Sequence, residues 1–321
     1  RVREIAVQGL PLMDDPRAFE ALLATTKDSA EKTRAAAMRS LGQCADDLRA
    51  TAYLLKGLGD ADSWVRYYAC QALGKLAFEP AAQAIVQLLS DPAGQVRVAA
   101  IEALSCLNSD AAVKALKAAA ADPDADIQRA AIVGLGVAKR AEGLPLILNA
   151  VRAPEASTRL VAISALAGFR TAEVLEAYRA AASDPDDSVR TAAVGFLAAM
   201  PGAVATKVLV DLLHTLPSTD QVLTALSLNV EGRVAGLVAA LQDADDEIAP
   251  GITSALTRLR RPDAVAALIK AMTIPNVAAR KATAGALATI GSKDALLALR
   301  KAASDDPEPQ VRQVCSLLLA R

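Results

Sequence analysis

One nine-residue pattern recurs along the chain and constrains its fold more than any other feature. In most copies Val, Thr or Ile precedes an Arg, Ala follows three residues after that Arg, and Leu follows four residues later. The pattern returns about every 31 residues, and its copies are VREIAVQGL at Val2, TRAAAMRSL at Thr33, VRYYACQAL at Val65, VRVAAIEAL at Val96, IQRAAIVGL at Ile127, TRLVAISAL at Thr158, VRTAAVGFL at Val189, IAPGITSAL at Ile248, ARKATAGAL at Ala279 and VRQVCSLLL at Val311. This period predicts one small structural unit stacked many times.

One stretch follows the pattern poorly. DQVLTALSL at Asp220 stands where a copy is due, and Gln221 takes the place of the Arg. Around residues 216–250 the repeat shortens to about 28 residues and contains Pro217 and Pro250. We count eleven repeat starts, the last incomplete, with a degenerate repeat that marks either a hinge or site, or tolerated sequence drift.

Each repeat is predicted to form two helices. Every copy carries apolar residues at i, i+4 and i+8, and a second apolar-periodic stretch follows, as in AAQAIVQLL from Ala81. The breaks match helix punctuation, with glycines predicted to close first helices (Gly42, Gly74, Gly168, Gly291) and Asp-Pro pairs predicted to follow second helices (Asp91, Asp122, Asp184, Asp306). The predicted fold is all-α, a right-handed α-solenoid of about ten to eleven stacked helical hairpins.

Two phrases carry a family resemblance, DPAGQVRVAAIEAL from Asp91 and DPDDSVRTAAVGFL from Asp184. They resemble the short HEAT-like repeats of bacteria and cyanobacteria, a class typified by phycobilin lyases. The resemblance covers essentially the whole chain and implies one HEAT-like, armadillo-like solenoid over residues 1–321, which we expect to be a fragment of a longer array. It is specific for fold and much less so for function, since such repeats serve scaffolds, adaptors and some enzymes.

A recurring arginine occupies the first turn of most first helices. We interpret this ladder as structural, because each Arg stands near aspartates of the preceding turn, such as Asp91, Asp122 and Asp187, and a motif present in every unit is what packing demands. In relatives such Arg and Asp residues join neighbouring repeats. The alternative is a cationic edge for an acidic ligand. The ladder comprises Arg3, Arg34, Arg66, Arg97, Arg159, Arg190, Arg280 and Arg312.

An aromatic pair is the one local anomaly. Trp64, the only tryptophan, precedes Val65, and Tyr67 follows three residues later. Residues three apart share a helix face, so the two rings are predicted to lie together and to offer a protein-binding anchor. The alternative is that Trp64 only covers the previous turn. Tyr68 aligns with residues expected to be buried and is predicted to be core.

No catalytic, metal or cofactor site is predicted. Cys70 and Cys315 fall on buried positions, Cys44 and Cys106 fall near first-helix ends, and no C-x-x-C pair occurs. His214 is the only histidine, so a thiol has no evident base. We expect His214 to be a partly buried polar residue, because no second ligand accompanies it at metal spacing.

Charge and hydropathy exclude several function classes. The net charge is −1 and the isoelectric point near 6.0, without the basic character that nucleic-acid binding usually requires. Residues 220–247 carry six acids against Arg233 alone, whereas residues 258–321 carry eleven Lys and Arg against five acids. No apolar run reaches membrane-spanning length, and the chain starts at Arg1 without a secretory signal, so we expect a cytoplasmic location.

The function predicted first is a non-catalytic protein-binding scaffold or adaptor, whose concave face, lined by second helices, grips a protein segment. The alternatives are a chromophore-handling enzyme like a phycobilin lyase, which needs an aromatic and acidic inner pocket, and a docking or regulatory arm of a larger protein. Nucleic-acid binding through the basic end, as in HEAT-like DNA glycosylases, is disfavoured because aromatic interleaving is lacking. A protein partner is expected, and the oligomeric state stays open.

Overall fold

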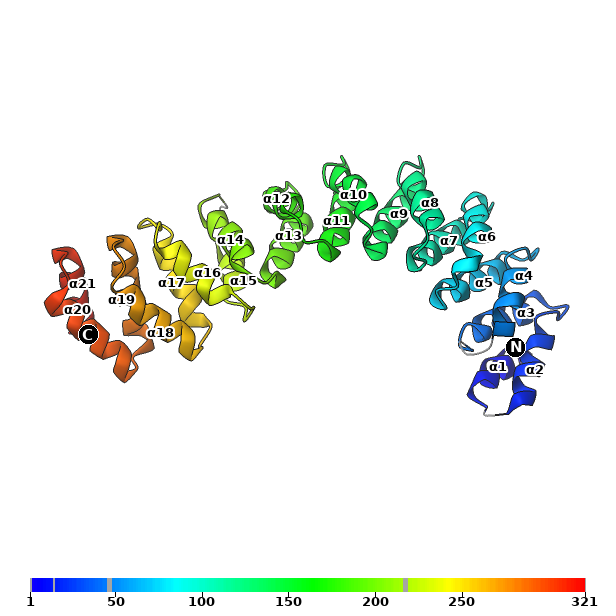
Figure 1. Cartoon of the computed structure of the whole chain (residues 1–321), viewed down its shortest axis with the longest axis horizontal. Helices are drawn as coiled ribbons and strands as arrows, with labels where there is room; N and C mark the ends of the chain where they lie inside the picture. Colours follow the sequence, from blue (N-terminus) through cyan, green and yellow to red (C-terminus); the bar gives the residue numbers. More distant parts are fainter. Residues whose placement is uncertain (1, 14, 45–47, 216–218, 321) are drawn as a thin grey trace. The chain divides into compact units, whose positions relative to one another are not determined.

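The computed structural model describes residues 2–13, 15–44, 48–215 and 219–320 (Figure 1). All regular structure in these residues is helical. The first helices of the repeats carry odd numbers and are α1 (Val2–Gly9), α3 (Glu31–Leu41), α5 (Ser63–Lys75), α7 (Gly94–Cys106), α9 (Ala125–Ala138), α11 (Ala156–Ala165), α13 (Asp187–Ala199), α15 (Asp220–Leu226), α17 (Ala249–Arg258), α19 (Val277–Ile290) and α21 (Pro309–Leu319).

The second helices carry even numbers and are α2 (Pro16–Thr25), α4 (Leu48–Gly57), α6 (Ala82–Gln87), α8 (Asp110–Ala119), α10 (Leu144–Ala150), α12 (Ala172–Ala181), α14 (Ala203–Thr215), α16 (Arg233–Leu241), α18 (Pro262–Ala271) and α20 (Lys293–Asp305). Short 3₁₀ turns extend some helices: η1 (Leu10–Leu12), η2 (Glu79–Ala81), η3 (Leu88–Ser90), η4 (Ala141–Gly143) and η5 (Leu166–Gly168). Over the described residues, eleven first helices and ten second helices alternate, which confirms the predicted α-solenoid of helical hairpins.

The contacts divide the chain into two compact units, Arg1–Phe169 and Arg170–Arg321. Within the first unit the most extensive contacts join consecutive first helices, α3 to α5, α5 to α7 and α7 to α9, and α3, α7 and α9 also pack on their own second helices (Figure 1). The second unit repeats this arrangement from α12 onward, with α17, α19 and α21 in succession. A single array over residues 1–321 stays a prediction.

The repeat length is constant in one part of the chain and varies in another. From α3 to α13, successive first helices begin 31 or 32 residues apart. After α13 the intervals become 33, 29, 28 and 32 residues. The irregularity predicted near residues 216–250 is therefore present, although Pro217 lies outside the described residues.

Side chains of the turns start the helices. Asp62 accepts the backbone N–H groups of Trp64 and Val65, and Asp186 accepts those of Ser188 and Val189. Such N-caps satisfy amide groups that have no partner inside the helix. The Asp-Pro pairs follow second helices or their 3₁₀ extensions within three residues, as predicted.

Small residues let the first helices approach closely. A Cβ atom added at Gly42 would lie 2.8 Å from Ala72 Cβ, and one added at Gly74 would lie 2.6 Å from Ala103 Cα. Gly74 was predicted to close its helix, but it lies inside the last turn of α5. Its missing side chain serves contact with α7 rather than helix termination.

The core consists mainly of Ala, Leu, Val and Ile. Cys70 and Cys315 are fully buried, as predicted. Burial, with a smaller contribution from Glu102, raises the pKa of Cys70 to about 12, and such a thiol is unreactive. Within the described part of the chain, no helix combines the length and apolar character that a membrane span requires.

Candidate functional site

The recurring arginines tie neighbouring turns together. Nη1 of Arg66 donates to the carbonyl oxygens of Asp60 and Ala61, six and five residues before it, at 2.8 and 3.0 Å. Its Nε and Nη2 donate to both carboxylate oxygens of Asp91, in the next turn, at 2.7 and 2.9 Å. We call this arrangement, one Arg with two carbonyls before it and one aspartate after it, the arginine clamp.

The clamp recurs in other repeats. Arg34 binds Asp60 through two bonds of 2.9 Å, and Arg280 binds Asp306 at 2.8 and 3.1 Å. Arg97 makes a single bond of 3.3 Å to Asp124. Bidentate pairing of this kind is strong and directional, and it holds successive turns in register.

The aspartate partner differs from the one expected. The sequence suggested aspartates of the preceding turn, yet that turn supplies carbonyls and the following turn supplies the carboxylate. Asp122, named as a partner, instead accepts the backbone N–H of Asp124 at 2.8 Å, while Arg97 reaches Asp124. Asp187 pairs with Arg190 inside one turn at 2.9 Å.

Each clamp aspartate also shapes its own turn. Asp91 Oδ1 accepts the N–H of Ala93 at 2.9 Å while both oxygens accept from Arg66. The bonds from Arg66 hold the pKa of Asp91 below its ordinary 3.8, and those from Arg34 do the same for Asp60. Arg159, Arg190 and Arg312 also donate to the two carbonyls five and six residues before them. Arg3 pairs with Asp28 at 3.0 Å.

Two first helices of the second unit, α15 and α17, lack the arginine, with Gln221 and Ala249 in its place. In the turn before α17, Asn276 binds the backbone carbonyls instead. Asn276 donates from Nδ2 to the carbonyls of Leu241, Gln242 and Ala244, at 3.3, 3.1 and 2.6 Å. It thus binds the turn before α17 from the turn before α19. Its Oδ1 caps α19 through the N–H of Ala279.

Arg233 is a buried cation in the same region. Its side chain is 1% exposed and donates to the carbonyl of Ala198 at 2.6 Å and to Thr206 Oγ1 at 3.2 Å. Ala198 lies at the carboxyl end of α13, where the helix dipole favours positive charge. Burial lowers the pKa of Arg233. The charge of Arg233 is therefore not at the surface, where it could pair with the acids of residues 220–247.

The aromatic pair lies together, as predicted. The ring centroids of Trp64 and Tyr67 are 5.5 Å apart in an edge-to-face arrangement. Tyr68 joins them, 6.1 Å from Trp64 and 5.1 Å from Tyr67, with the Arg39 guanidinium 6.0 Å from its centroid. Trp64 is 51% exposed. Tyr68 is only half-buried, so its assignment to the core was wrong, because a ring does not fit where Ala36 and Ala99 are buried.

The aromatic cluster borders a hollow of about 480 Å³ on the first helices. Trp64 and Tyr68 line one side, and charged residues of α1, α3 and the turn before α5 line the rest: Glu4, Glu31, Lys32, Arg39 and Asp62. We call it the aromatic hollow. It does not belong to the second helices, where partner binding was expected.

A larger groove lies in the second unit. It has a volume of about 1040 Å³ and lies among α18, α19, α20 and the turn before α21. Leu297, 65% exposed, provides apolar surface, and Lys301 and Asp305 provide charges of opposite sign.

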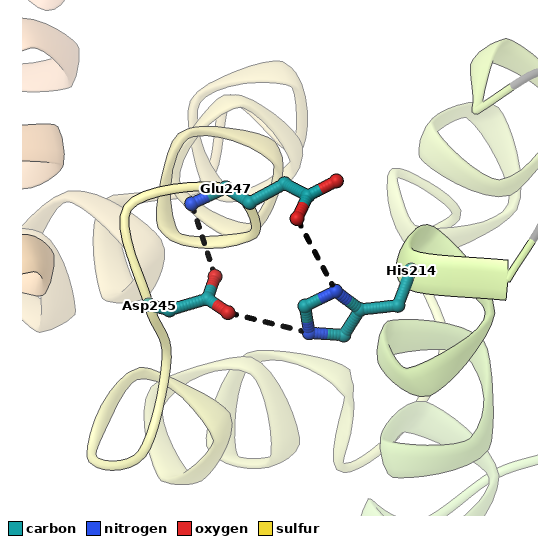
Figure 2. Close-up of side chains that lie close together, drawn as sticks. All are labelled: His214, Asp245 and Glu247. Atoms are coloured by element: carbon teal, nitrogen blue, oxygen red, sulfur yellow. Dashed lines mark hydrogen bonds and ion pairs between the residues drawn. The ribbon is translucent and has the colours of Figure 1, made fainter.

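His214 differs from its prediction. Its side chain is exposed at the end of α14, and the carboxylates of Asp245 and Glu247 lie beside its two ring nitrogens (Figure 2). Sequence spacing did not reveal this cluster, because the acids follow the histidine by more than thirty residues. Alignment with Asp62 and Asp186 could have placed Asp245 at the N-terminus of its helix, but not beside His214.

Solved structures share the fold at low identity. Importin beta has a TM-score of 0.50 at 17% identity, with 99% of this chain and 55% of that chain covered. The CpcE–CpcF complex of phycocyanin lyase from a Nostoc species has a TM-score of 0.44 at 22% identity, covering 74% and 92%. Human deoxyhypusine hydroxylase has a TM-score of 0.34 at 24% identity, covering 77% and 98%. Of these, only the importin beta match supports an argument, and it concerns fold alone.

No curated protein matches the sequence. The family model for HEAT repeats, in contrast, matches residues 51–136, 144–228 and 234–320, most of the chain. Together with the stacked helical hairpins, this match identifies the repeat type expected from the phrases at Asp91 and Asp184. The chain belongs to the HEAT-repeat family.

Proposed function

We propose that this HEAT-repeat chain is a non-catalytic protein-binding scaffold, and that the aromatic hollow contacts the partner. The observation that carries the proposal is the exposed Trp64 at the edge of this hollow, packed against Tyr67 and Tyr68. Large aromatic side chains with a fixed orientation dominate the energetics of protein interfaces, because they bury much area and lose little conformational entropy.

The chemistry of the hollow favours a partner segment with a Lys or Arg side chain next to an apolar one. Aromatic ring faces attract cations, and three acids, Glu4, Glu31 and Asp62, line the same hollow. Arg39, which lies against Tyr68, and Lys32 provide the opposite charge at the rim. Such mixed surroundings favour one orientation of the incoming segment.

The remaining parts of the proposal follow from the contacts of the arginines. We assign Arg34, Arg66, Arg97, Arg159, Arg190, Arg280 and Arg312 to holding the turns, since their guanidinium groups donate to carbonyls of the turns. Arg34, Arg66, Arg97 and Arg280 also donate to a carboxylate of the next turn. The proposed function therefore does not use these arginines as a cationic edge for an acidic ligand. Nucleic-acid binding and catalysis are not part of the proposed function, and a cytoplasmic location stays a prediction.

Site-specific photo-crosslinking tests the proposal. A photoreactive phenylalanine derivative replaces Trp64, and the full chain is exposed to native lysate and irradiated. We expect one protein to be crosslinked from this position, with its crosslinked segment containing Lys or Arg. The matched control places the same group at Leu297, which is also exposed and lies in the other unit.

Affinity measurements with the purified partner complete the test. Because Trp64 is the only tryptophan, its fluorescence reports occupancy of the hollow directly when the partner segment contains no Trp. Trp64→Ala, followed by calorimetry, is expected to weaken binding by roughly 30-fold or more, the range of an interface hot spot. Equal crosslinking from both positions, or unchanged affinity of Trp64→Ala, contradicts the proposal. A bound pigment in the eluate would favour a chromophore-handling function instead.

A further inference from the structure

His214, Asp245 and Glu247 form a compact group of metal-binding side chains (Figure 2). His214 Nε2 lies 3.6 Å from Asp245 Oδ2, and His214 Nδ1 lies 3.7 Å from Glu247 Oε2. One ligand atom from each of the three residues lies within 4.8 Å of the others. Among the residues that the structure describes, no other group of three His, Cys, Asp or Glu side chains meets this condition.

Backbone hydrogen bonds and helix packing position the group. Asp245 Oδ1 accepts the N–H groups of Glu247 and Ile248, both at 3.0 Å, which orients the second oxygen toward the imidazole (Figure 2). On the opposite side, a Cβ atom added at Gly251 would lie 3.2 Å from Leu213 Cδ1. The end of α14 therefore lies close against α17, and the histidine and the two acids are brought together by packed helices.

The surrounding charges leave a local excess of two negative charges. Asp246 pairs with Lys281 at 2.7 Å, and Asp211, one turn before His214, lies 3.7 Å from Arg179. The one arginine of the acidic stretch, Arg233, is buried away from the surface. The carboxylates of Asp245 and Glu247 thus carry two negative charges that one divalent cation would neutralise.

We propose that His214, Asp245 and Glu247 bind a zinc ion. One imidazole nitrogen and two carboxylate oxygens are a ligand set that zinc accepts, with water in the fourth position. Imidazole disfavours calcium and magnesium, which prefer oxygen ligands. Adjacent ligand atoms of a tetrahedral zinc are about 3.3 Å apart, given bonds of about 2.0 Å. A single ion binds one imidazole nitrogen, and the three ligand atoms lie within 4.8 Å of one another, so the exposed side chains have to close by up to about 1.5 Å around the ion.

The ion would connect repeats where the arginine clamp is missing. His214 ends a second helix, whereas Asp245 and Glu247 lie in the turn before α17, a helix whose clamp position holds Ala249. A zinc ion would therefore connect the end of α14 to the turn between α16 and α17. We expect zinc to raise the unfolding temperature of the chain, because it binds only the folded arrangement.

Zinc titration of the full chain tests this proposal. Cys44→Ser and Cys106→Ser are introduced first, since these two cysteines are not buried and thiols bind zinc. Competition with a chromophoric chelator is expected to give one zinc per chain. His214→Gln and Glu247→Gln should each weaken binding at least 10-fold, because even hydrogen-bond partners of ligands change metal affinity by about 10- to 100-fold.

The matched control is Glu231→Gln, an exposed acid of the same stretch outside the cluster, which should bind zinc like the parent chain. Circular dichroism checks that each variant folds. The imidazole NMR signals provide a site-specific readout, because His214 is the only histidine, and they should shift on addition of one equivalent. No saturable zinc binding, or equal binding by the two ligand variants and the control, overturns the proposal.

Discussion

The turn before α7 and the turn before α17 are held in different ways. At the first, Asp91 binds Arg66 of the preceding repeat and its carbonyl accepts from Arg97 of its own repeat at 3.1 Å. At the second, the helix starts with Ala249 in place of the arginine, and the turn carbonyls accept from Asn276 of the next turn instead.

The comparison shows what the fold requires and what it leaves free. The turn carbonyls need a donor, because a backbone acceptor without a partner is costly away from water. The identity and direction of that donor can change. Where the arginine is absent, acids of the turn can make other contacts, and Asp245 and Glu247 face His214.

Removing a clamp arginine should give the largest effect. Arg66 and Asp91 are 13% and 5% exposed, so Arg66→Ala leaves a nearly buried carboxylate without its partner. We expect a loss of about 3 kcal/mol in the free energy of unfolding, measured by urea denaturation. Arg17→Ala, an exposed pair, is the control and should change little. A loss below about 1 kcal/mol for Arg66→Ala would show that the clamp is dispensable.

The degenerate turn should depend on Asn276. Asn276→Asp keeps an oxygen that caps α19 but removes the amide that donates to three carbonyls. We expect a loss of about 1 to 2 kcal/mol, because the carbonyls of Leu241 and Ala244 lose a donor in a partly buried turn. Hydrogen exchange of α17 amides should accelerate at the same time. Unchanged exchange would mean that this turn is held by other contacts.

Acid should weaken the clamps first. The pKa of Asp91 is lowered in the folded chain, mainly by Arg66, so its contribution to stability is complete above its ordinary 3.8. That contribution is lost as the pH falls through the lower folded value. Unfolding free energy measured from pH 6 to pH 2 should therefore fall below about pH 4, and less steeply in Asp91→Asn. Equal slopes in both proteins would contradict the assignment.

A missing clamp should be restorable. In α9 the arginine position holds Gln128, which donates to the Ala120 carbonyl at 3.3 Å, and the expected aspartate position 25 residues later holds Ala153. Gln128→Arg with Ala153→Asp should stabilise by about 1 kcal/mol more than the two single changes together, measured in a double-mutant cycle. Additive effects would show that these positions do not meet.

The smallest expected effect concerns His214 without metal. In the presence of a chelator, His214→Gln should change the free energy of unfolding by less than about 0.5 kcal/mol, as for most exposed positions. Thermal unfolding followed by circular dichroism provides the measurement. A large loss would mean that the imidazole itself holds the second unit together.

The repeat made most of the fold predictable, since one period fixes helix type, helix order and the alternation of first and second helices. Trp64 and Tyr67 were also predictable, because neighbours on one helix need no knowledge of tertiary packing. The clamp partners were not, since both flanking turns offer aspartates and only the stacking decides which one the guanidinium reaches. The assignment of Tyr68 to the core was wrong because alignment gives the position of a side chain but not the space available to it. The prediction that His214 is partly buried and stands without a second ligand was wrong because irregular repeat lengths hide which side chains meet.

The substitution at Gln128 has a mechanical consequence. In the first unit, an Arg–Asp pair links the successive turns of most repeats. Between α9 and α11 this pair is missing, because Gln128 and Ala153 stand at the two positions. Apolar contact between α9 and α11 still holds them, but such contact resists sliding less than directional bonds do. When a pulling force acts along the first unit, we expect the contact between α9 and α11 to separate before the contacts that an arginine clamp supports.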